Sequence, residues 1–508
     1  MTMASMACTF VPLPDLQGRL QHALRDGCRI GLLTARQTPA SGSGMALETL
    51  MIDPAKGRLE VLESELPPGA TSYPSLAPAL PQLHGFERCI HDLFGVTPAG
   101  HPRLQPILLH EAWPSGYHPL CDPGVQPPDP DAPRQSYEFV TVHGDGIYEV
   151  PVGPIHAGII EPGHFRFNCL GEVIYNLEIR LGYLHRGVEE TLTRTPWRQA
   201  RFVVEAISSD TTVANALAHS LALEQILGVE PPAQAVNLRA AALEMERVAS
   251  HIGDLGGISG DIGFSAGASI FGRLRGAALG LLERLTGSRF GSAYILPGGV
   301  SRGSAERMRT VLIEEALRIR VEFERSAPML MENAGALERM EGTGVVSRSV
   351  AAAIGMVGPA GRASGIPYDV RKSLRQEPYA SLQWDEAAGD SGDVLSRARV
   401  RVQEIITSLG ILIALLERLP DDARTPHRTD MPRDLPPNRV GAGVVEAWRG
   451  ELIHLAFTDA EGKIARYAVK DPSFNNWSGL TIAVREELLS DFPLCNKSFG
   501  LSYSGNDL

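Results

Sequence analysis

Two histidines and a glutamate lie close together in a segment rich in glycine and proline, residues 153–167. They are His156, Glu161 and His164, and the glycines and prolines around them predict a loop of fixed shape that leads into a strand. Imidazoles in such a loop could bind a polar head group or relay protons near neutral pH. The plainer interpretation, which the residues alone favour, is that both histidines hydrogen-bond the turn.

Two other groups of ionisable residues have their own alternatives. Glu189 follows Gly187, where a buried glutamate could pass protons if its surroundings shift its pKa, but an exposed acidic start of a helix explains it equally well. Glu244, Arg247 and His251 share one face of a predicted helix. That spacing favours a network of ion pairs between packed helices over a catalytic site.

The string Gly-x-Ser-x-Gly at residues 263–267 matches the nucleophile elbow of hydrolases. An elbow needs a strand before it, whereas a glycine-rich stretch, residues 253–260, precedes this one. We therefore predict a small-residue loop between helices. No phosphate-binding loop or other nucleotide site is recognisable in the sequence.

The elements that must position these residues are mostly helices. Beyond about residue 170, apolar residues recur at three- and four-residue spacing. They predict helices over residues 201–227, 238–255, 270–285, 306–337 and 394–419. Alternation within residues 443–469, around the turn at 459–462, predicts a β-hairpin.

The first part of the chain mixes short alternating apolar runs with helical stretches. A proline-rich linker, residues 126–133, ends it, because proline at that density continues neither helix nor central strand. We predict an α+β fold with two parts: a small N-terminal α+β domain, residues 1–134, and a large helix-rich domain with peripheral β-hairpins, residues 135–508.

Composition excludes several classes of function. The net charge of −12 argues against nucleic acid as a partner, because phosphate binding needs a basic surface. No two of the six cysteines lie within four residues of each other, so a zinc knuckle or typical iron–sulfur run is absent, and the thiols are expected to be reduced. Neither a secretory signal nor a membrane span is recognisable, so any membrane association must come through partner proteins.

Several of these segments together resemble a known family. Residues 153–192, 244–251, 362–371 and 471–508 are similar, in order, to four stretches shared by group 4 membrane-associated [NiFe]-hydrogenase large subunits and the 49 kDa subunit of respiratory complex I. Residues 86–102 resemble the signature of the 30 kDa complex I subunit. A fusion of these two parts is typical of large subunits in the formate hydrogenlyase and hydrogenase-4 complexes, and the resemblance covers nearly the whole chain.

The resemblance fails at the metal ligands. Hydrogenases have an Arg-x-Cys-Gly-x-Cys motif and a C-terminal Asp-Pro-Cys motif with a second cysteine three positions later. Here Ala206 takes the place of the arginine. Ser208, Thr211, Ser473 and Asn476 take the places of the four cysteines. Thiolates hold soft nickel and iron, whereas hydroxyl and amide groups do not, so no metal ligand and no cofactor bound by this chain is expected.

The resemblance also implies where other chemistry would occur. Glu189 matches the proton-relay glutamate of hydrogenases, and Asp210 and Asp369 would add ionisable groups to the same cavity. His164 matches the histidine at the quinone head group in complex I. The tyrosine of that site would fall at Ser209. Catalytic candidates are therefore His164, Glu189, Asp210 and Asp369, and His156, His164 and Ser209 would line a quinone cavity.

The leading hypothesis is an oxidoreductase subunit of a complex I-like, hydrogenase-4-related membrane complex without a Ni–Fe centre. The resemblance implies a peripheral place for it on the cytoplasmic face of the inner membrane. The resemblance implies an iron–sulfur small subunit that holds the clusters, antiporter-like membrane subunits that move ions, and an electron donor such as a formate or NADH dehydrogenase module. Electrons could pass to a quinone. One alternative is a non-catalytic scaffold. A working hydrogenase with unusual ligands is a further alternative, which hard oxygen ligands disfavour.

Overall fold

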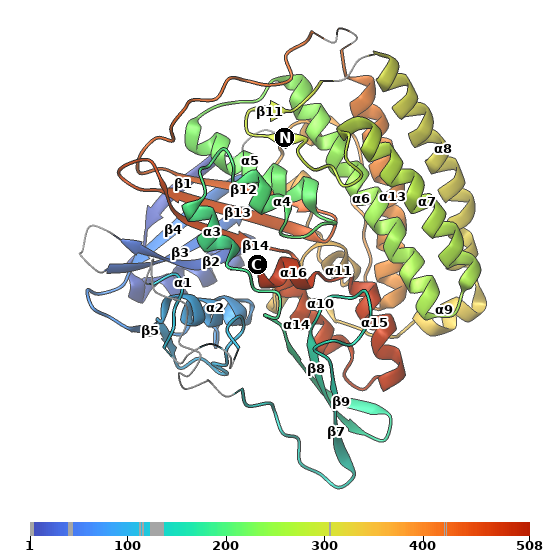
Figure 1. Cartoon of the computed structure of the whole chain (residues 1–508). Helices are drawn as coiled ribbons and strands as arrows, with labels where there is room; N and C mark the ends of the chain where they lie inside the picture. The colour runs from blue at the N-terminus through green and yellow to red at the C-terminus, as the bar shows by residue number, and fades with distance from the viewer. Residues whose placement is uncertain are drawn as a thin grey trace.

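The computed structural model describes residues 5–38, 44–110, 113, 116–121, 137–303, 306–420, 422 and 424–508. The predicted proline-rich linker and the boundary after residue 134 lie outside these residues. The N-terminal part is built on a sheet of strand order β1-β4-β3-β2, in which β1 runs parallel to β4 and the other pairs are antiparallel (Figure 1). Its strands are β1 (Ser5–Phe10), β2 (Arg29–Thr38), β3 (Gly44–Asp53) and β4 (Arg58–Glu65).

Two helices pack against this N-terminal sheet. They are α1 (Leu13–Arg25) and α2 (His84–Phe94). In α1, Leu16, Leu20 and Ala23 are buried at helical spacing, which turns one face of the helix to the sheet. A short parallel pair, β5 (Ser72–Pro74) and β6 (Thr97–Ala99), flanks α2.

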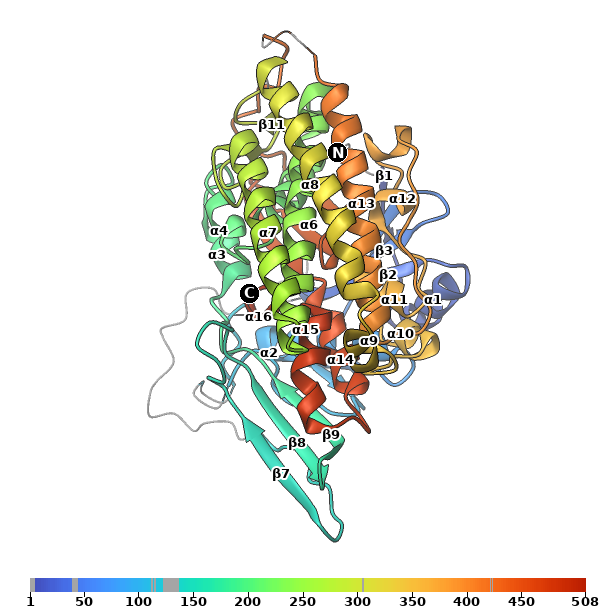
Figure 2. The ribbon, with the colours of Figure 1, turned by 90° about the vertical axis from the view of Figure 1, so that its right-hand side faces the viewer.

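The large part is dominated by long helices, as the sequence predicts. Four of them lie side by side in both views (Figures 1 and 2): α6 (Ala233–Asp261), α7 (Ser265–Thr286), α8 (Glu306–Met331) and α13 (Val394–Glu417). The chain passes from the end of α6 to the start of α7 through residues 262–264. Of the Gly-x-Ser-x-Gly string, Gly263 and Phe264 lie in this connection and Ser265 begins α7, so the predicted loop is confirmed only for the first two residues, and a helix rather than a strand precedes it.

Two predicted helices are divided. Residues 201–227 form α4 (Arg201–Glu205) and α5 (Thr212–Leu227), and residues 306–337 form α8 followed by α9 (Ala334–Met340). The break at residues 206–211 carries several of the candidate residues. The shorter helices are α3 (Val188–Arg194), α10 (Arg348–Ala353), α11 (Gly358–Ala363), α12 (Val370–Ser373), α14 (Ser473–Ala483), α15 (Phe492–Phe499) and α16 (Tyr503–Asp507).

The large part also contains two antiparallel sheets of three strands and one short strand pair. Strands β7 (Ile147–Val152), β8 (His164–Leu170) and β9 (Val173–Arg180) form an arm that projects from the body (Figure 2). Strands β12 (Val440–Ala447), β13 (Gly450–Thr458) and β14 (Ile464–Lys470) form a buried sheet, so the predicted hairpin is confirmed and gains a strand. The short pair is β10 (Ile295–Leu296) and β11 (Gly299–Val300).

The two parts share an apolar core. Leu32 and Leu50 of the N-terminal sheet belong to the same buried cluster as Ile453 and Ala468 of the β12–β14 sheet. The approach is so close at Gly31 that an added Cβ would lie 2.7 Å from Ile453 Cδ1. The N-terminal part is therefore fixed against the large part. Of the helices in the described part of the chain, none combines the length and apolarity needed to cross a membrane.

Candidate functional site

The loop between α4 and α5 brings its polar side chains together around one carboxylate. Ser208 Oγ donates to Asp210 Oδ1 at 2.8 Å, and Thr211 Oγ1 donates to the same oxygen at 3.0 Å. Ser208 and Thr211 are buried, whereas the Asp210 side chain is 36% exposed. Two of the four positions that match hydrogenase cysteines are therefore tied to Asp210.

Arg449 completes this cluster from the two-residue turn between β12 and β13. Its Nη2 lies 2.7 Å from Asp210 Oδ2 and its Nη1 lies 2.8 Å from Oδ1, a bidentate ion pair. Nη1 also donates to Thr211 Oγ1 at 3.0 Å, and Nε donates to the Gly500 carbonyl at 2.5 Å. The guanidinium stacks over the Trp448 ring at 3.8 Å, so its three nitrogens are hydrogen-bonded and one of its faces is covered.

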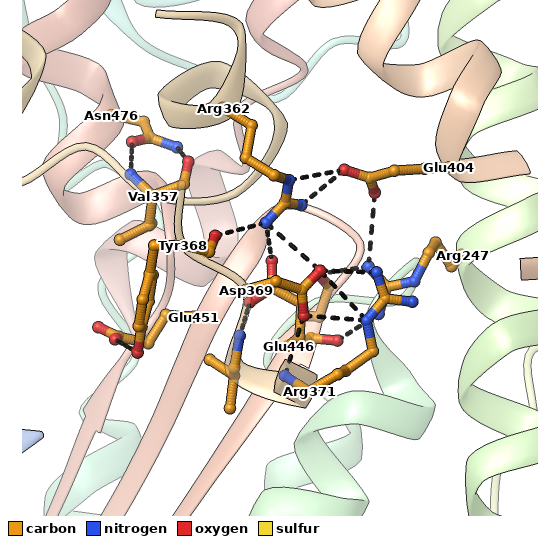
Figure 3. Close-up of polar contacts among 12 residues, drawn as sticks. Arg247, Val357, Arg362, Tyr368, Asp369, Arg371, Glu404, Glu446, Glu451 and Asn476 are labelled. Carbon is orange, nitrogen blue, oxygen red and sulfur yellow. Dashed lines mark hydrogen bonds and ion pairs between the residues drawn. The ribbon is translucent and has the colours of Figure 1, made fainter. Parts of the chain in front are cut away.

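The other two matched positions lie on α14. Ser473 Oγ accepts a hydrogen bond from Ser502 N at 2.9 Å, and Ser502 Oγ lies 3.3 Å from Ser208 Oγ. The chain end thereby bridges the two halves of the site. Asn476 is held instead by Val357: its Oδ1 accepts from Val357 N at 3.0 Å and its Nδ2 donates to Val357 O at 3.1 Å (Figure 3).

These four positions do not fit a Ni–Fe centre. The donors are three hydroxyls and an amide, and each is already hydrogen-bonded to a protein group. Soft metals prefer thiolates, and a guanidinium that touches Thr211 adds a positive charge where a metal cation would bind. Within the residues that the structure describes, no three His, Cys, Asp or Glu side chains converge as metal ligands.

The electrostatics keep Asp210 charged. Burial raises the pKa of Asp210, but the Arg449 guanidinium and the hydrogen bonds from Arg449, Ser208 and Thr211 outweigh it and hold this pKa at about 2. An open cleft of about 230 Å³ lies over the pair, lined by Asp210, Ser250, Asp254, Arg275 and Trp448 among others. The ion pair is thus accessible from one side.

Asp369 lies elsewhere, in a deeply buried network of arginines and carboxylates (Figure 3). Arg371 Nη2 lies 2.7 Å from Asp369 Oδ2, and Arg362 Nη1 lies 3.6 Å from the same oxygen. Arg362 also pairs with Glu404 at 2.6 Å and with Glu446 at 2.8 Å. Asp369 and Asp210 make no direct contact and have different partners, so the prediction that they share a cavity stays a prediction.

The predicted helix-face network belongs to this cluster. Arg247 Nε lies 3.3 Å from Glu244, His251 Nε2 lies 2.8 Å from Glu404, and Arg371 Nη1 lies 3.0 Å from Glu244. Tyr379 donates to Glu244 at 2.6 Å. The structure therefore bears out the interpretation as ion pairs between packed helices.

Charge balance explains one pKa shift in this network. Three arginines, Arg247, Arg362 and Arg371, face four carboxylates, which are Glu244, Asp369, Glu404 and Glu446. Burial lowers the pKa of His251, which favours the neutral form of this imidazole. One carboxylate is in excess. Burial, and then the Asp369 charge, raise the pKa of Glu446 to about 7, so a proton on Glu446 leaves three charges of each sign.

A series of polar residues, joined partly by hydrogen bonds and partly by the chain itself, leads from this network toward α14. The Tyr368 carbonyl accepts from Arg362 at 2.8 Å, and the Tyr368 hydroxyl donates to Glu451 at 2.5 Å. Lys470 Nζ lies 2.6 Å from Glu451, and Asp471 follows Lys470 in the chain. Asp471 Oδ1 accepts from Ser473 N at 2.8 Å, while its buried Oδ2 has no hydrogen-bond partner in the described residues.

Glu189 is buried rather than exposed, so the interpretation as an exposed helix start is wrong. Its Oε1 accepts from Val469 N at 2.9 Å and its Oε2 pairs with Arg466 at 2.9 Å. A largely apolar cavity of about 60 Å³ adjoins it, with Lys470 and Asp471 in the same lining. Glu189 and Asp471 therefore face one cavity.

The loop histidines behave as the plainer interpretation predicts. His156 Nδ1 donates to the Pro154 carbonyl at 3.1 Å, and His164 Nδ1 donates to the Gly153 carbonyl at 3.3 Å. Burial lowers the pKa of His164, and its buried Nε2 has no hydrogen-bond partner in the part of the chain that the structure describes. His156 lies 3.5 Å from the Tyr503 hydroxyl, one residue from Ser502, so the loop approaches the Asp210 site through the chain end.

Comparisons with known proteins identify the family of the chain. The family model described as "Respiratory-chain NADH dehydrogenase, 49 Kd subunit" matches residues 261–507, and that of the 30 Kd subunit matches residues 40–123. Hydrogenase-4 component G of Escherichia coli K12 is 29% identical over 97% of this chain and 86% of its own. Formate hydrogenlyase subunit 5 of the same strain is 31% identical over 86% of this chain and 77% of its own.

A solved structure is also similar. A chain of the membrane-bound sulfane sulfur reductase, an archaeal respiratory membrane complex, superposes with a TM-score of 0.66 at 27% identity, covering 72% of this chain and 99% of that one. The chain therefore belongs to the family of group 4 hydrogenase and complex I large subunits in which a 30 kDa-like and a 49 kDa-like part are fused.

Sequence reasoning missed Arg449, Ser502 and Asp471 as members of the site. The signal for Arg449 is the pair Trp448-Arg449 before Gly450, which interrupts two apolar runs as a two-residue hairpin turn does. Nothing in the sequence links that turn to Asp210, 239 positions away.

Proposed function

We propose that this chain is the large subunit of a membrane-associated, complex I-like and hydrogenase-4-related oxidoreductase that works without a Ni–Fe centre. The Asp210–Arg449 ion pair carries the proposal, because it lies among the former ligand positions and uses their hydroxyls. Its fixed cation takes the place of a metal cation beside Thr211. The donor set and this charge both oppose nickel.

In this role the chain handles protons and transmits a change of charge to partner subunits. Three features support that role: Glu189 and Asp471 at one cavity, the polar run from Asp471 to Arg362, and Glu446 with a pKa near 7. The electron acceptor would bind near His164, whose Nε2 is buried without a hydrogen-bond partner in the described residues, and His156 and Ser209 would complete its surroundings. A quinone is one such acceptor, and a sulfane sulfur compound, suggested by the name of the structural relative, is another.

The complexes to which the relatives belong suggest the partners of this chain. An iron–sulfur subunit would dock near Asp210, on antiporter-like membrane subunits at the cytoplasmic face, and a formate or NADH dehydrogenase module would supply electrons. All named relatives come from hydrogenase-type or respiratory complexes, which supports a place in such an assembly.

The test uses the complex purified with its partners. His164→Gln and Glu189→Gln are compared with His22→Gln, a matched control because His22 is 65% exposed and pairs only with Asp26 in the described residues. Reduction of a quinone or a sulfane sulfur compound is measured, with assembly checked by size-exclusion chromatography. Loss of turnover in both site variants, with intact assembly and an active His22→Gln, supports the proposal.

A non-catalytic scaffold is the second candidate. It is favoured by the complete internal hydrogen bonding of Ser208, Thr211, Ser473 and Asn476, which leaves none of them directed at a ligand. Unchanged turnover in His164→Gln and Glu189→Gln would favour this candidate.

A further inference from the structure

A second cleft, of about 360 Å³, is lined by residues of α2, the end of β9 and α14. It is distinct from the Asp210 site, with which it shares no lining residue. Four arginines line it, and they come from three regions of the chain: Arg88 and Arg103 from the N-terminal part, Arg180 from β9, and Arg485 from just beyond α14.

The charge of this cleft is opposite to that of the whole chain. The chain carries a net charge of −12, yet the only carboxylate among the lining residues that the structure describes is Glu178. Arg103 pairs with Glu178, which also accepts from the Tyr137 hydroxyl at 2.7 Å and from Val140 N at 2.8 Å. Among the described lining residues, arginines therefore outnumber carboxylates by four to one.

The pKa of a histidine in the cleft, His84, is also affected by these arginines. Burial, and then the charges of Arg88, His101 and Arg103, lower the pKa of His84 to about 4. His84 lines the cleft and remains neutral at neutral pH. Burial alone would disfavour a charge of either sign, so only the contribution of the two arginines, Arg88 and Arg103, to this pKa shift indicates a positive field.

Two of the cationic groups are held in place. Arg88 donates to the Gln105 carbonyl at 2.6 Å and to the Pro106 carbonyl at 2.9 Å, and Arg180 stacks over the Tyr137 ring at 4.5 Å. Fixed cations bind anions better than mobile ones because less side-chain entropy is lost. The side chain of the exposed Arg485 makes no hydrogen bond or ion pair with another described residue, so its guanidinium is available.

Hydrogen-bond donors and apolar groups complete the walls. Asn475, Ser478 and Thr481 recur every third residue along α14 and all face the cleft. Trp477 and Ile107 give it an apolar portion. The cleft therefore suits an anion that also has a non-polar body.

We propose that this cleft binds a phosphate-bearing ligand, either a soluble organic phosphate or the phosphate head group of a lipid. No lysine lines the cleft in the described residues, and the planar guanidinium of arginine matches phosphate oxygens two at a time. The α14 wall begins at Ser473, so bound phosphate would contact the helix that also carries two former metal-ligand positions. The inference does not depend on the proposed redox function.

The experiment measures binding to the full purified chain, or to its complex, by titration calorimetry and vesicle flotation. The probes are inorganic phosphate, AMP, succinate, and vesicles of phosphatidylglycerol or phosphatidylcholine. Arg485→Gln is the test variant. Arg399→Gln is its matched control, because Arg399 is an exposed arginine of α13 outside the lining of the cleft.

We expect saturable binding of a phosphate-bearing probe that weakens about five- to tenfold in Arg485→Gln and is unchanged in Arg399→Gln. Binding of AMP without vesicle binding identifies a soluble ligand, and binding to phosphatidylglycerol but not phosphatidylcholine vesicles identifies a lipid head group. Binding of succinate alone, no saturable binding, or equal affinity in both variants would overturn the assignment.

Discussion

The Asp210–Arg449 pair and the network around Arg362 are both built from arginines and carboxylates, yet they differ in burial. Asp210 is 36% exposed and opens on a cleft, whereas the side chains of Arg362, Asp369, Glu404 and Glu446 are at most 2% exposed. A buried charge that loses its partner has no water to replace it, whereas an exposed one does. The network should therefore determine stability and packing, and the open pair should tolerate change and contribute chiefly to function.

The largest effect is expected when the buried network loses its central cation. Arg362→Met leaves Glu404, Glu446 and Asp369 without this guanidinium, so the free energy of unfolding should fall by about 4 kcal/mol. Urea unfolding of the purified chain measures it. Arg399→Met, on the same helix as Glu404 but exposed, should change little. A loss below about 1 kcal/mol for Arg362→Met would mean that the network is not structural.

Removing the cation of the open pair should cost less. In Arg449→Met, Asp210 can be hydrated from the adjoining cleft, so we expect a loss of about 2 kcal/mol in the same urea experiment. Assembly with partner subunits should persist while turnover falls. If Arg449→Met destabilises the chain more than Arg362→Met does, the contrast between the two regions is wrong.

The pH dependence of the open pair has a definite sign. The pKa of Asp210 in the folded chain, about 2, lies below its ordinary value of 3.8, so the unfolded chain binds the proton more readily. The pair therefore contributes fully above pH 3.8, and its contribution disappears as pH falls toward 2. The stability difference between wild type and Asp210→Asn, measured by denaturant unfolding from pH 7 downward, should shrink over that window. A difference that stays constant down to pH 2 would exclude Asp210 as the titrating group.

The smallest effect is expected at Glu446. Its pKa is raised from 4.5 to about 7, so between these pH values the folded chain holds a proton that the unfolded chain has lost, and stability falls as pH rises. Glu446→Gln removes this slope. At pH 6 the variant should differ from wild type by less than about 1 kcal/mol, because the wild-type carboxyl is then mostly protonated. A large loss at pH 6 would show that Glu446 is charged there.

The sequence predicts the helices well, because apolar spacing and burial agree along α6, α7 and α13. It also predicts the network of Glu244, Arg247 and His251, since one helix face contains them. The break at residues 206–211 was not predicted, although four polar residues in a row, residues 208–211, interrupt the apolar spacing there. The domain boundary after residue 134 stays a prediction.

The candidate site is predicted only in part. The motif positions locate Ser208, Thr211 and Ser473, but their hydrogen bonds depend on Arg449 and Ser502, which only the folded chain brings near. The burial of Glu189 could not be predicted from the sequence either, because the groups that surround it, Arg466 and the β14 backbone, lie far along the chain. Long-range contacts of this kind leave no local pattern.

The decisive measurement is the nickel and iron content of the complex, purified with its partners from cells grown with nickel. We expect iron from the clusters of the partner subunits and no stoichiometric nickel, with the same nickel content in wild type and in Arg449→Met. About one nickel per chain in the wild type would contradict this expectation, because oxygen and amide donors beside a guanidinium would then hold a metal that prefers thiolates.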